Sequence, residues 1–204
     1  MRDYWVSNRK YGTTPVGKQQ GPGLSYPGFV TALEAYDLTT KGGGGDFARV
    51  IAACESFGPY CLIEGLAVNC YVEPVYTLDA DFVVVAQVLQ QVAALLEHEG
   101  FTIRRFSNSV NAQTPISDLR VQFTTDQRYQ EFPARSQLRE VLGVQTRVAC
   151  LEDVVRGKLW AYSGPQRRLS KRKKDELDLI RLAEAYPELR ELYPKELLDQ
   201  LAGF

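Results

Sequence analysis

Two aspartates, Asp79 and Asp81, stand one residue apart in the stretch 77–85, where acidic and apolar residues alternate. Alternation of this kind is typical of a strand, in which every second side chain points to the same side. Two carboxylates on one side repel each other, and burying them without a counterion is costly. Mg²⁺ suits such a pair, because it takes oxygen ligands and commonly binds phosphate oxygens as well. The spacing alone also fits a solvated strand face or a salt-bridged pair.

The flanking sequence adds groups that handle phosphate. Upstream, Gly65 follows the predicted buried strand 60–63 and opens a short predicted helix, where backbone N–H groups can approach a phosphate. Downstream, Asp118 lies on the predicted strand 116–123, with Arg120 and Gln122 on the same face. Three acids from two neighbouring strands, close to a helix N-terminus, predict a two-metal site for phosphoryl transfer.

A basic run between residues 167 and 174 holds six cations in eight residues and no acid. One interpretation is a phosphate or RNA contact, whose strength would depend on salt. The other is a solvated helix start, balanced by Asp175, Glu176 and Asp178. Positive charge at a helix N-terminus opposes the helix dipole, which favours the functional interpretation.

The elements that must position these residues follow from hydrophobic periodicity and from the glycines and prolines between them. Residues 1–45 are predicted to be a flexible Gly/Pro-rich arm with a short helix near 29–36 and a linker at Gly42–Gly45. Residues 46–150 are predicted to form an α/β core and residues 151–204 a helical C-terminal lobe. The expected core helices cover 46–57, 65–71 and 87–99, with Asp46 as an N-cap, and the expected strands cover 60–63, 77–85, 101–106, 116–123 and 145–150. A turn or short helix is expected at 137–143, and lobe helices at 151–162, 170–186 and 188–202. The fold class is therefore α+β, a mixed sheet flanked by helices.

Composition excludes several other classes of protein. The 204 residues are 45% hydrophobic and 24% charged, with a formal net charge of −1, which is typical of a globular chain and shows no general basic excess. No apolar run reaches membrane-spanning length and no secretory signal is evident, so we expect a cytoplasmic protein without a membrane partner. A single histidine and four cysteines with no CxxC pair argue against an ordinary zinc site.

The ordered motifs resemble the minimal nucleotidyltransferase fold of the DNA polymerase β superfamily. They are a strand followed by Gly65-Leu66-Ala67, then Thr77-Leu-Asp-Ala-Asp81, then a third acidic strand. The tail is similar to the helical signature of the AbiEii-like toxin-type group. Its matching residues are Leu151-Glu-Asp-Val154, Lys158, Arg168, Lys174-Asp175 and Asp178.

The resemblance implies roles for particular residues. Asp79 and Asp81 would be catalytic and hold two Mg²⁺ ions, with Asp118 as the third catalytic acid, either a metal ligand or a general base. The implied nucleotide-binding residues are Gly65, Thr77, Lys158, Lys174 and Asp178. Further contacts to phosphate or RNA are expected from Arg120, Arg168 and Lys171.

The resulting hypothesis is a Mg²⁺-dependent nucleotidyltransferase that moves a nucleoside monophosphate from an NTP to an acceptor hydroxyl. The resemblance suggests RNA, such as a tRNA 3′ end, as acceptor, a toxin-like bacterial role and a small antitoxin partner. The sequence departs from the family's Gly-Gly or Gly-Ser turn, because Glu64 stands at the first position. The alternative is therefore a catalytically degenerate binding or regulatory module with the same fold.

Overall fold

The structure is a computed structural model that describes residues 32–201. Residues 1–31 of the predicted arm and residues 202–204 of the predicted C-terminal lobe lie outside the described residues. The helices are α1 (Ala32–Thr40), α2 (Gly43–Glu55), α3 (Glu64–Val68), α4 (Leu89–His98), α5 (Leu151–Tyr162), α6 (Leu169–Ala185) and α7 (Lys195–Leu201). The strands are β1 (Tyr60–Ile63), β2 (Asp79–Val84), β3 (Thr102–Arg105), β4 (Ser109–Gln113), β5 (Arg120–Thr124), β6 (Gln137–Val141) and β7 (Val144–Val148). Three 3₁₀ helices cover Gln127–Tyr129, Phe132–Arg135 and Pro187–Leu192.

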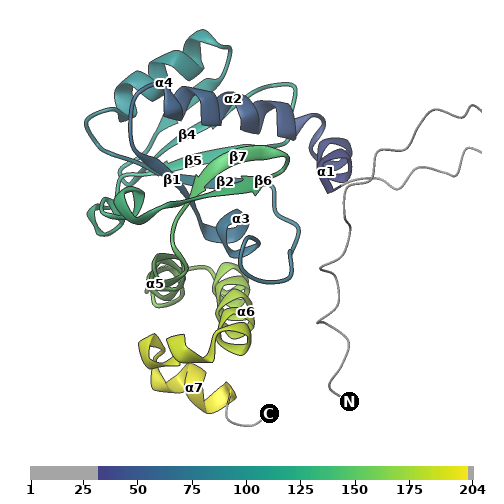
Figure 1. Cartoon of the computed structure of the whole chain (residues 1–204). Coiled ribbons are helices and arrows are strands. Elements are labelled where there is room, and N and C mark those ends of the chain that lie inside the picture. The colour runs from purple at the N-terminus through teal and green to yellow at the C-terminus, as the bar shows by residue number, and fades with distance from the viewer. Residues whose placement is uncertain (1–31, 202–204) are drawn as a thin grey trace, which may run out of the picture. The chain divides into compact units, whose positions relative to one another are not determined.

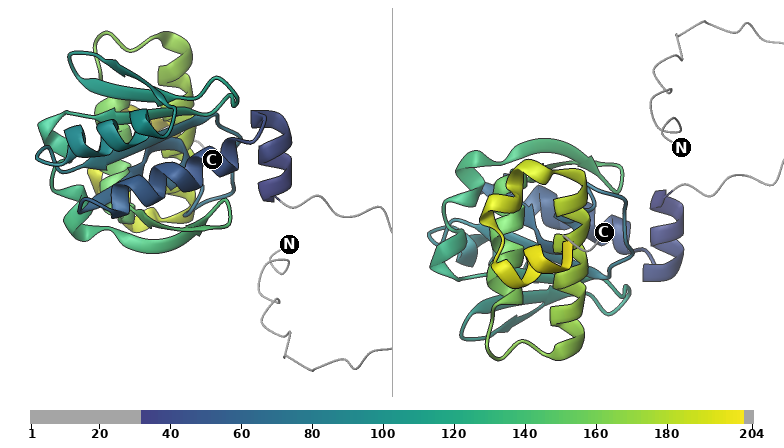
Figure 2. Two further views of the ribbon diagram at one scale, coloured as in Figure 1. Left: turned by 90° about the horizontal axis from the view of Figure 1, so that it is seen from above. Right: turned by 90° about the horizontal axis from the view of Figure 1, so that it is seen from below.

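The strands form one seven-stranded mixed sheet in the order β3-β4-β5-β2-β1-β7-β6. Strand β2 lies near its centre, antiparallel to β1 and parallel to β5. Helices α2 and α4 cover one face, whereas α3, α5, α6 and α7 lie on the other side (Figure 1). Figure 2 shows the same two layers from above and from below. The α+β class expected from the sequence is confirmed.

Strand β2 separates a polar side from an apolar side by simple alternation. Ala80 and Phe82 are buried, whereas Asp79 and Asp81 are only partly covered. The Phe82 ring packs between Phe47 of α2 and Phe123 of β5, with centroid separations of 6.0 and 5.7 Å. This buried row fixes the register of the strand, since a shift by one residue would bring the carboxylates into the core. The aspartates must therefore face away from α2.

Several element boundaries differ from the sequence prediction. The strand expected at 116–123 begins only at Arg120, and Asp118 precedes it. Strand β4 was not predicted, and the expected turn or short helix at 137–143 is strand β6. The lobe helix expected at 188–202 is divided into a 3₁₀ helix and α7, with Pro194 between them. The helix expected at 151–162 is confirmed as α5.

The glycine run is a tightly packed helix start, which corrects the linker prediction. Gly43, Gly44 and Gly45 begin α2, and the first two are buried. The Gly44 N–H donates to Asp37 Oδ1 at 2.7 Å, and the Gly43 N–H donates to Thr40 Oγ1 at 2.9 Å. A Cβ on either glycine would collide with these α1 side chains. Glycine therefore serves here for close approach between two helices and not for freedom of the backbone.

Asp46 is the second residue whose local role was mispredicted. It is not an N-cap, because α2 already begins at Gly43. Its buried carboxylate accepts hydrogen bonds from the Thr114 and Ser117 hydroxyls and pairs with Arg49. Asp46 thereby anchors the segment that leads into β5.

A buried ionic cluster joins the sheet domain to the C-terminal helices. Lys158 of α5 places its Nζ 2.7 Å from Glu64 Oε2, 2.9 Å from Asp178 Oδ2 and 3.2 Å from Asp175 Oδ1. Burial by itself would lower the pKa of Lys158, but Glu64, Asp178 and Asp175 raise it above its ordinary value. Lys158 is thus a permanent cation at the junction of α3, α5 and α6.

No helix in residues 32–201 has the length and apolar character needed to cross a membrane.

The glycine run predicts opposite effects for neighbouring alanine substitutions. Gly45 has open space around it, so Gly45→Ala should raise the free energy of unfolding by up to about 1 kcal/mol through helix propensity. Gly44→Ala should lower it by about 1–3 kcal/mol, because the new Cβ would lie 2.6 Å from Asp37 Oδ1 and 2.7 Å from Leu33 Cδ1. Urea unfolding measures both changes, and two shifts of the same sign would contradict this packing.

Lys158→Met should lower the free energy of unfolding by about 3–5 kcal/mol, because it leaves a buried carboxylate cluster short of its central cation. Asp175 would keep Arg167 and Asp178 would keep Arg181, but Glu64 would lose its cation. Lys195→Met, at an exposed position on α7, is the matched control and should change stability by less than about 0.5 kcal/mol. Equal urea midpoints for the two variants would be evidence against the cluster.

Candidate active site

A polar cavity of about 820 Å³ lies beside β2 and β5 and is bordered by α5 and α6. This volume is in the range of small-molecule binding sites. Its lining includes five acidic and six basic side chains from separate elements. The acids are Glu64, Asp79, Asp81, Asp126 and Asp175, and the cations are Arg120, Arg128, Lys158, Arg167, Lys171 and Lys174.

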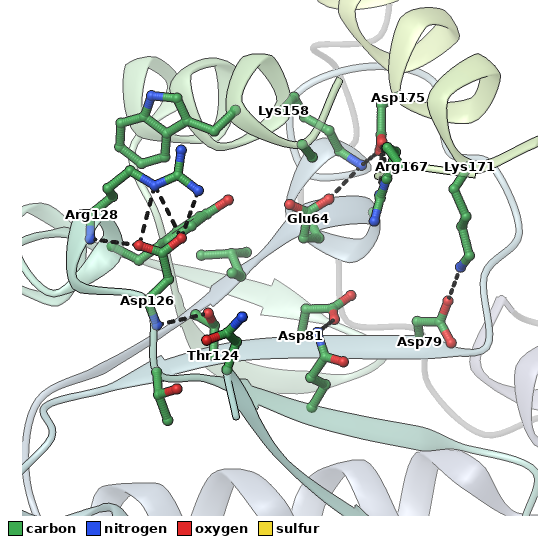
Figure 3. A pocket seen from close by; sticks show the side chains of 18 of the residues that line it. Glu64, Asp79, Asp81, Thr124, Asp126, Arg128, Lys158, Arg167, Lys171 and Asp175 are labelled. Atoms are coloured by element: carbon green, nitrogen blue, oxygen red, sulfur yellow. Dashed lines mark hydrogen bonds and ion pairs between the residues drawn. The ribbon is translucent and has the colours of Figure 1, made fainter. Parts of the chain in front are cut away.

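Asp79 is held by cations from two elements. Arg120 Nε of β5 lies 2.7 Å from Asp79 Oδ1, and Lys171 Nζ of α6 lies 3.1 Å from Asp79 Oδ2. The parallel pairing of the two strands sets Arg120 directly opposite Asp79. Figure 3 shows Lys171 reaching down from α6 to this carboxylate. The sheet and the helical lobe thus each contribute a cation to the same aspartate.

Asp81 has a different environment. Gln122 stands opposite it on β5 and donates its side-chain amide to Asp81 Oδ1 at 3.3 Å. Among the described residues, no cation forms an ion pair with Asp81. Burial raises the pKa of Asp81 to about 7, and the negative charges of Glu64 and Asp79 add to this effect. Positive charge from a ligand would therefore be favoured at this carboxylate.

Glu64 enters the site because β1 ends beside β2. The antiparallel register sets Ile63 opposite Asp81, so the next residue emerges next to the aspartate pair. Glu64 has a left-handed backbone with φ 60°, a conformation that favours glycine. Burial opposes ionisation of the Glu64 carboxyl, but Lys158 at 2.7 Å lowers its pKa below the ordinary value. The position directly after β1 is thus filled by a carboxylate bound to a buried lysine.

One end of the cavity combines a glycine turn with lysine. A Cβ on Gly65 would lie 3.5 Å from Thr77 Cγ2 and 3.7 Å from Lys174 Nζ, so these groups surround the turn closely. Lys174 Nζ also lies 3.4 Å from Thr77 Oγ1. Together with Lys171, they form a cationic end that suits phosphate oxygens.

The other end contains a rigid arginine. Arg128 binds Asp126 through Nη2 at 2.6 Å and Nε at 3.0 Å. Its guanidinium carbon also lies 5.0 Å from the centroid of the Trp160 ring, which packs against Tyr129 and Phe132 as well. In Figure 3 the Asp126–Arg128 pair and the Asp79–Lys171 pair lie on opposite sides of Asp81. The aspartate pair is thus situated between the cationic end of the cavity and the end formed by Asp126 and Arg128.

The structure brings together most of the residues predicted from the sequence. Those that line the cavity are Gly65, Thr77, Asp79, Asp81, Arg120, Lys158, Lys171 and Lys174. Asp178 does not line it, but it is buried against Lys158 and Arg181. Arg168 is exposed at the start of α6 and does not line the cavity.

Asp118 is not brought together with the aspartate pair. It lies before β5 and lines a separate hollow, where its carboxylate is 3.2 Å from Lys41 Nζ. Its N–H donates to the Thr40 carbonyl, which ties this residue to the end of α1. The predicted geometry assumed that the strand began at residue 116. Because the strand begins later, the side chains facing Asp79 and Asp81 are Arg120 and Gln122.

The side chains present fit one divalent cation better than two. Asp79 and Asp81 are a suitable oxygen pair for Mg²⁺, which often uses one or two carboxylates together with substrate phosphates. Within residues 32–201, however, no group of three or more histidine, cysteine, aspartate or glutamate side chains is arranged to hold a metal ion. The third carboxylate of a two-metal site is missing from β5.

The sequence prediction missed the polar end of the cavity and the role of Glu64. Asp126 and Arg128 belong to the sequence Thr124-Thr-Asp-Gln-Arg-Tyr129, which directly follows the strand beside the aspartate pair. Polar residues at the end of such a strand were the available signal. Glu64 and Lys158 lie far apart along the sequence, with most of the core between them, so no local pattern indicated that they pair.

No protein-family model matches the sequence, and no match was found among curated proteins. Among solved structures, the antibiotic-resistance factor ANT(2'')-Ia in solution is similar at a TM-score of 0.54 and 12% identity, covering 79% of this chain and 94% of that one. The lincomycin-bound lincosamide antibiotic adenylyltransferase LnuA matches with a TM-score of 0.48 and 13% identity, over 70% of this chain and 96% of LnuA. An antigenic nucleotidyltransferase-like protein from Paracoccidioides brasiliensis matches with a TM-score of 0.48 and 18% identity, over 85% of this chain and 88% of that protein. The first likeness shows the fold alone, so this chain shares the α+β fold of that antibiotic-resistance factor.

Proposed function

We propose that the protein is a divalent-metal-dependent nucleotidyltransferase that moves a nucleoside monophosphate from an NTP to an acceptor hydroxyl. The observation that carries this proposal is the Asp79–Asp81 pair, which shares one cavity with cations from β5 and α6. The lining holds one more basic than acidic side chain, and a divalent cation bound by the aspartates would add the positive charge that a triphosphate needs. The fold of a known antibiotic-resistance factor supports the same class of function.

Each group in the cavity has a chemical task in this reaction. Lys171, Lys174 and the turn at Gly65 would bind the triphosphate, and Asp79 and Asp81 would hold Mg²⁺. A Mg²⁺ ion held by these two carboxylates would supply charge neutralisation of the phosphates and orientation of the attacking oxygen. The acceptor oxygen bonds to the α-phosphorus while the bond from that phosphorus to the bridging oxygen breaks. Pyrophosphate departs with the bond electrons, and the hydroxyl proton passes to solvent. Arg120 can offset negative charge on the transferred phosphoryl group.

The acceptor proposed first is an RNA 3′ hydroxyl, such as that of tRNA. Arg168 is exposed beside the cavity-lining residues Arg167 and Lys171, so the start of α6 offers positive charge outside the cavity as well. Charge of this kind suits an extended phosphate backbone. A toxin-like role restrained by a small antitoxin partner would follow from modification of tRNA ends. An aminoglycoside is the comparison acceptor, because ANT(2'')-Ia was solved in complex with adenylyl-2''-tobramycin.

The second candidate is a nucleotide-binding module that does not catalyse transfer. Glu64 favours it, because this residue puts a carboxylate and a left-handed backbone where the family turn has glycine. The ion pair with Lys158 weakens this argument against catalysis, because a buried cation balances the negative charge of Glu64. Nucleotide binding without any transfer would support the module.

Label transfer tests the proposed enzyme. The purified protein is incubated with each α-labelled NTP, Mg²⁺ and either total tRNA or tobramycin, and labelled products are separated by gel or chromatography. We expect label in one acceptor, and a loss of at least about 100-fold in rate for Asp79→Asn or Asp81→Asn. Asp199→Asn, on the exposed face of α7, should retain the rate. Transfer that is unaffected by both active-site variants would refute the assignment.

Metal affinity should depend on pH around neutrality. The pKa of Asp81 is raised to about 7, so its carboxyl is protonated below that pH, and a bound cation must displace the proton. Mn²⁺ affinity without nucleotide, measured by water-proton relaxation, should therefore increase about tenfold from pH 6 to pH 8. Glu64→Gln should lower the midpoint of this rise, because it removes a nearby negative charge. A constant affinity between pH 6 and pH 8 would disagree with this environment for Asp81.

A further inference from the structure

We propose that the cavity takes one divalent cation and not two, and that the Arg120 guanidinium stands in the place of the second cation beside Asp79. The inference rests on the proposed function and concerns how the same site handles charge. The structural observation that supports this inference is the parallel pairing of β2 with β5.

The register of the sheet leaves no position for a third carboxylate. Asp79 pairs with Arg120 and Asp81 pairs with Gln122, so these are the β5 residues that share the face of the aspartates. The next residue on that face is Thr124. An acid of β5 able to bridge to a second ion would have to occupy one of these positions, and none of them is acidic.

The two oxygens of Asp79 already carry positive partners. Arg120 Nε contacts Oδ1 at 2.7 Å, and Lys171 Nζ contacts Oδ2 at 3.1 Å. A planar guanidinium on a carboxylate supplies a fixed positive charge with directed N–H groups, which can also donate to phosphate oxygens. A second metal ion would have to displace this cation and would gain no additional carboxylate in return.

The remaining acids of the lining are also engaged. Lys158 binds Glu64, Arg128 binds Asp126, and Arg167 binds Asp175 at 2.7 Å. Asp118 is held by Lys41 in another hollow. Of the carboxylates that line this cavity, only Asp81 has no ion-pair partner among the described residues. The charge pattern therefore leaves room for one divalent cation.

The count of bound ions tests the inference directly. Mn²⁺ replaces Mg²⁺, a non-hydrolysable NTP analogue fills the site, and electron paramagnetic resonance measures the bound ions per chain and any coupling between their spins. We expect one bound Mn²⁺ per chain and an uncoupled spectrum. Two ions at the separation of about 3.5–4 Å found in two-metal sites would couple their spins. A coupled pair in the unmodified protein overturns the inference but leaves the proposed function in place.

Variants on β5 supply the converse experiment. Arg120→Asp and Gln122→Asp each introduce a third carboxylate opposite the aspartate pair and should raise the bound Mn²⁺ from one to two per chain. Arg104→Asp, an exposed charge reversal on β3 outside this cavity, should stay at one. If both β5 variants fold and still bind one ion, Arg120 does not stand in place of a second. Absence of any bound ion in the unmodified protein refutes the proposed function itself, and this inference with it.

Discussion

The repulsion between two aspartates on adjacent outward positions of one strand is the constraint to which the rest of the site responds. The buried row of Ala80 and Phe82 fixes which way Asp79 and Asp81 face, so the carboxylates cannot turn away from each other. Their charge has to be balanced by neighbouring elements. Strand β5 contributes Arg120 and Gln122, and α6 contributes Lys171. The sheet order and the attachment of the helical lobe are both part of this balance.

Glu64 shows how the fold tolerates a residue that a left-handed backbone disfavours. A left-handed backbone at a residue other than glycine costs roughly 1–2 kcal/mol. The buried Lys158 offsets that cost by giving the carboxylate a strong partner, and the same lysine also draws Asp175 and Asp178 of α6 toward the core. Glu64 therefore contributes to the attachment of the lobe, because its pair with Lys158 joins α3 to α5 and, through the same lysine, to α6.

Local patterns were sufficient to predict some parts of this molecule and insufficient for others. The alternation around Asp79 and Asp81 placed both carboxylates on one face, because the period of a strand is a property of neighbouring residues. The position of Asp118 depended on where β5 begins, and the Thr114 and Ser117 bonds to distant Asp46 contribute to holding the preceding segment outside the strand. The role of Gly44 depends on contact with Asp37 across a helix corner. Composition alone cannot distinguish such a close approach from a flexible linker.

Lys171 links the helical lobe to the carboxylate pair on the sheet. It belongs to the helical lobe, but its ammonium group contacts a carboxylate at the centre of the sheet. A ligand that binds Asp79 Oδ2 competes with this contact, so ligand binding and the Lys171–Asp79 contact are coupled by one free energy, which acts equally in both directions. Filling of the cavity therefore changes how strongly α6 is held to β2 at this point, while the buried Lys158 cluster continues to join the lobe to α3.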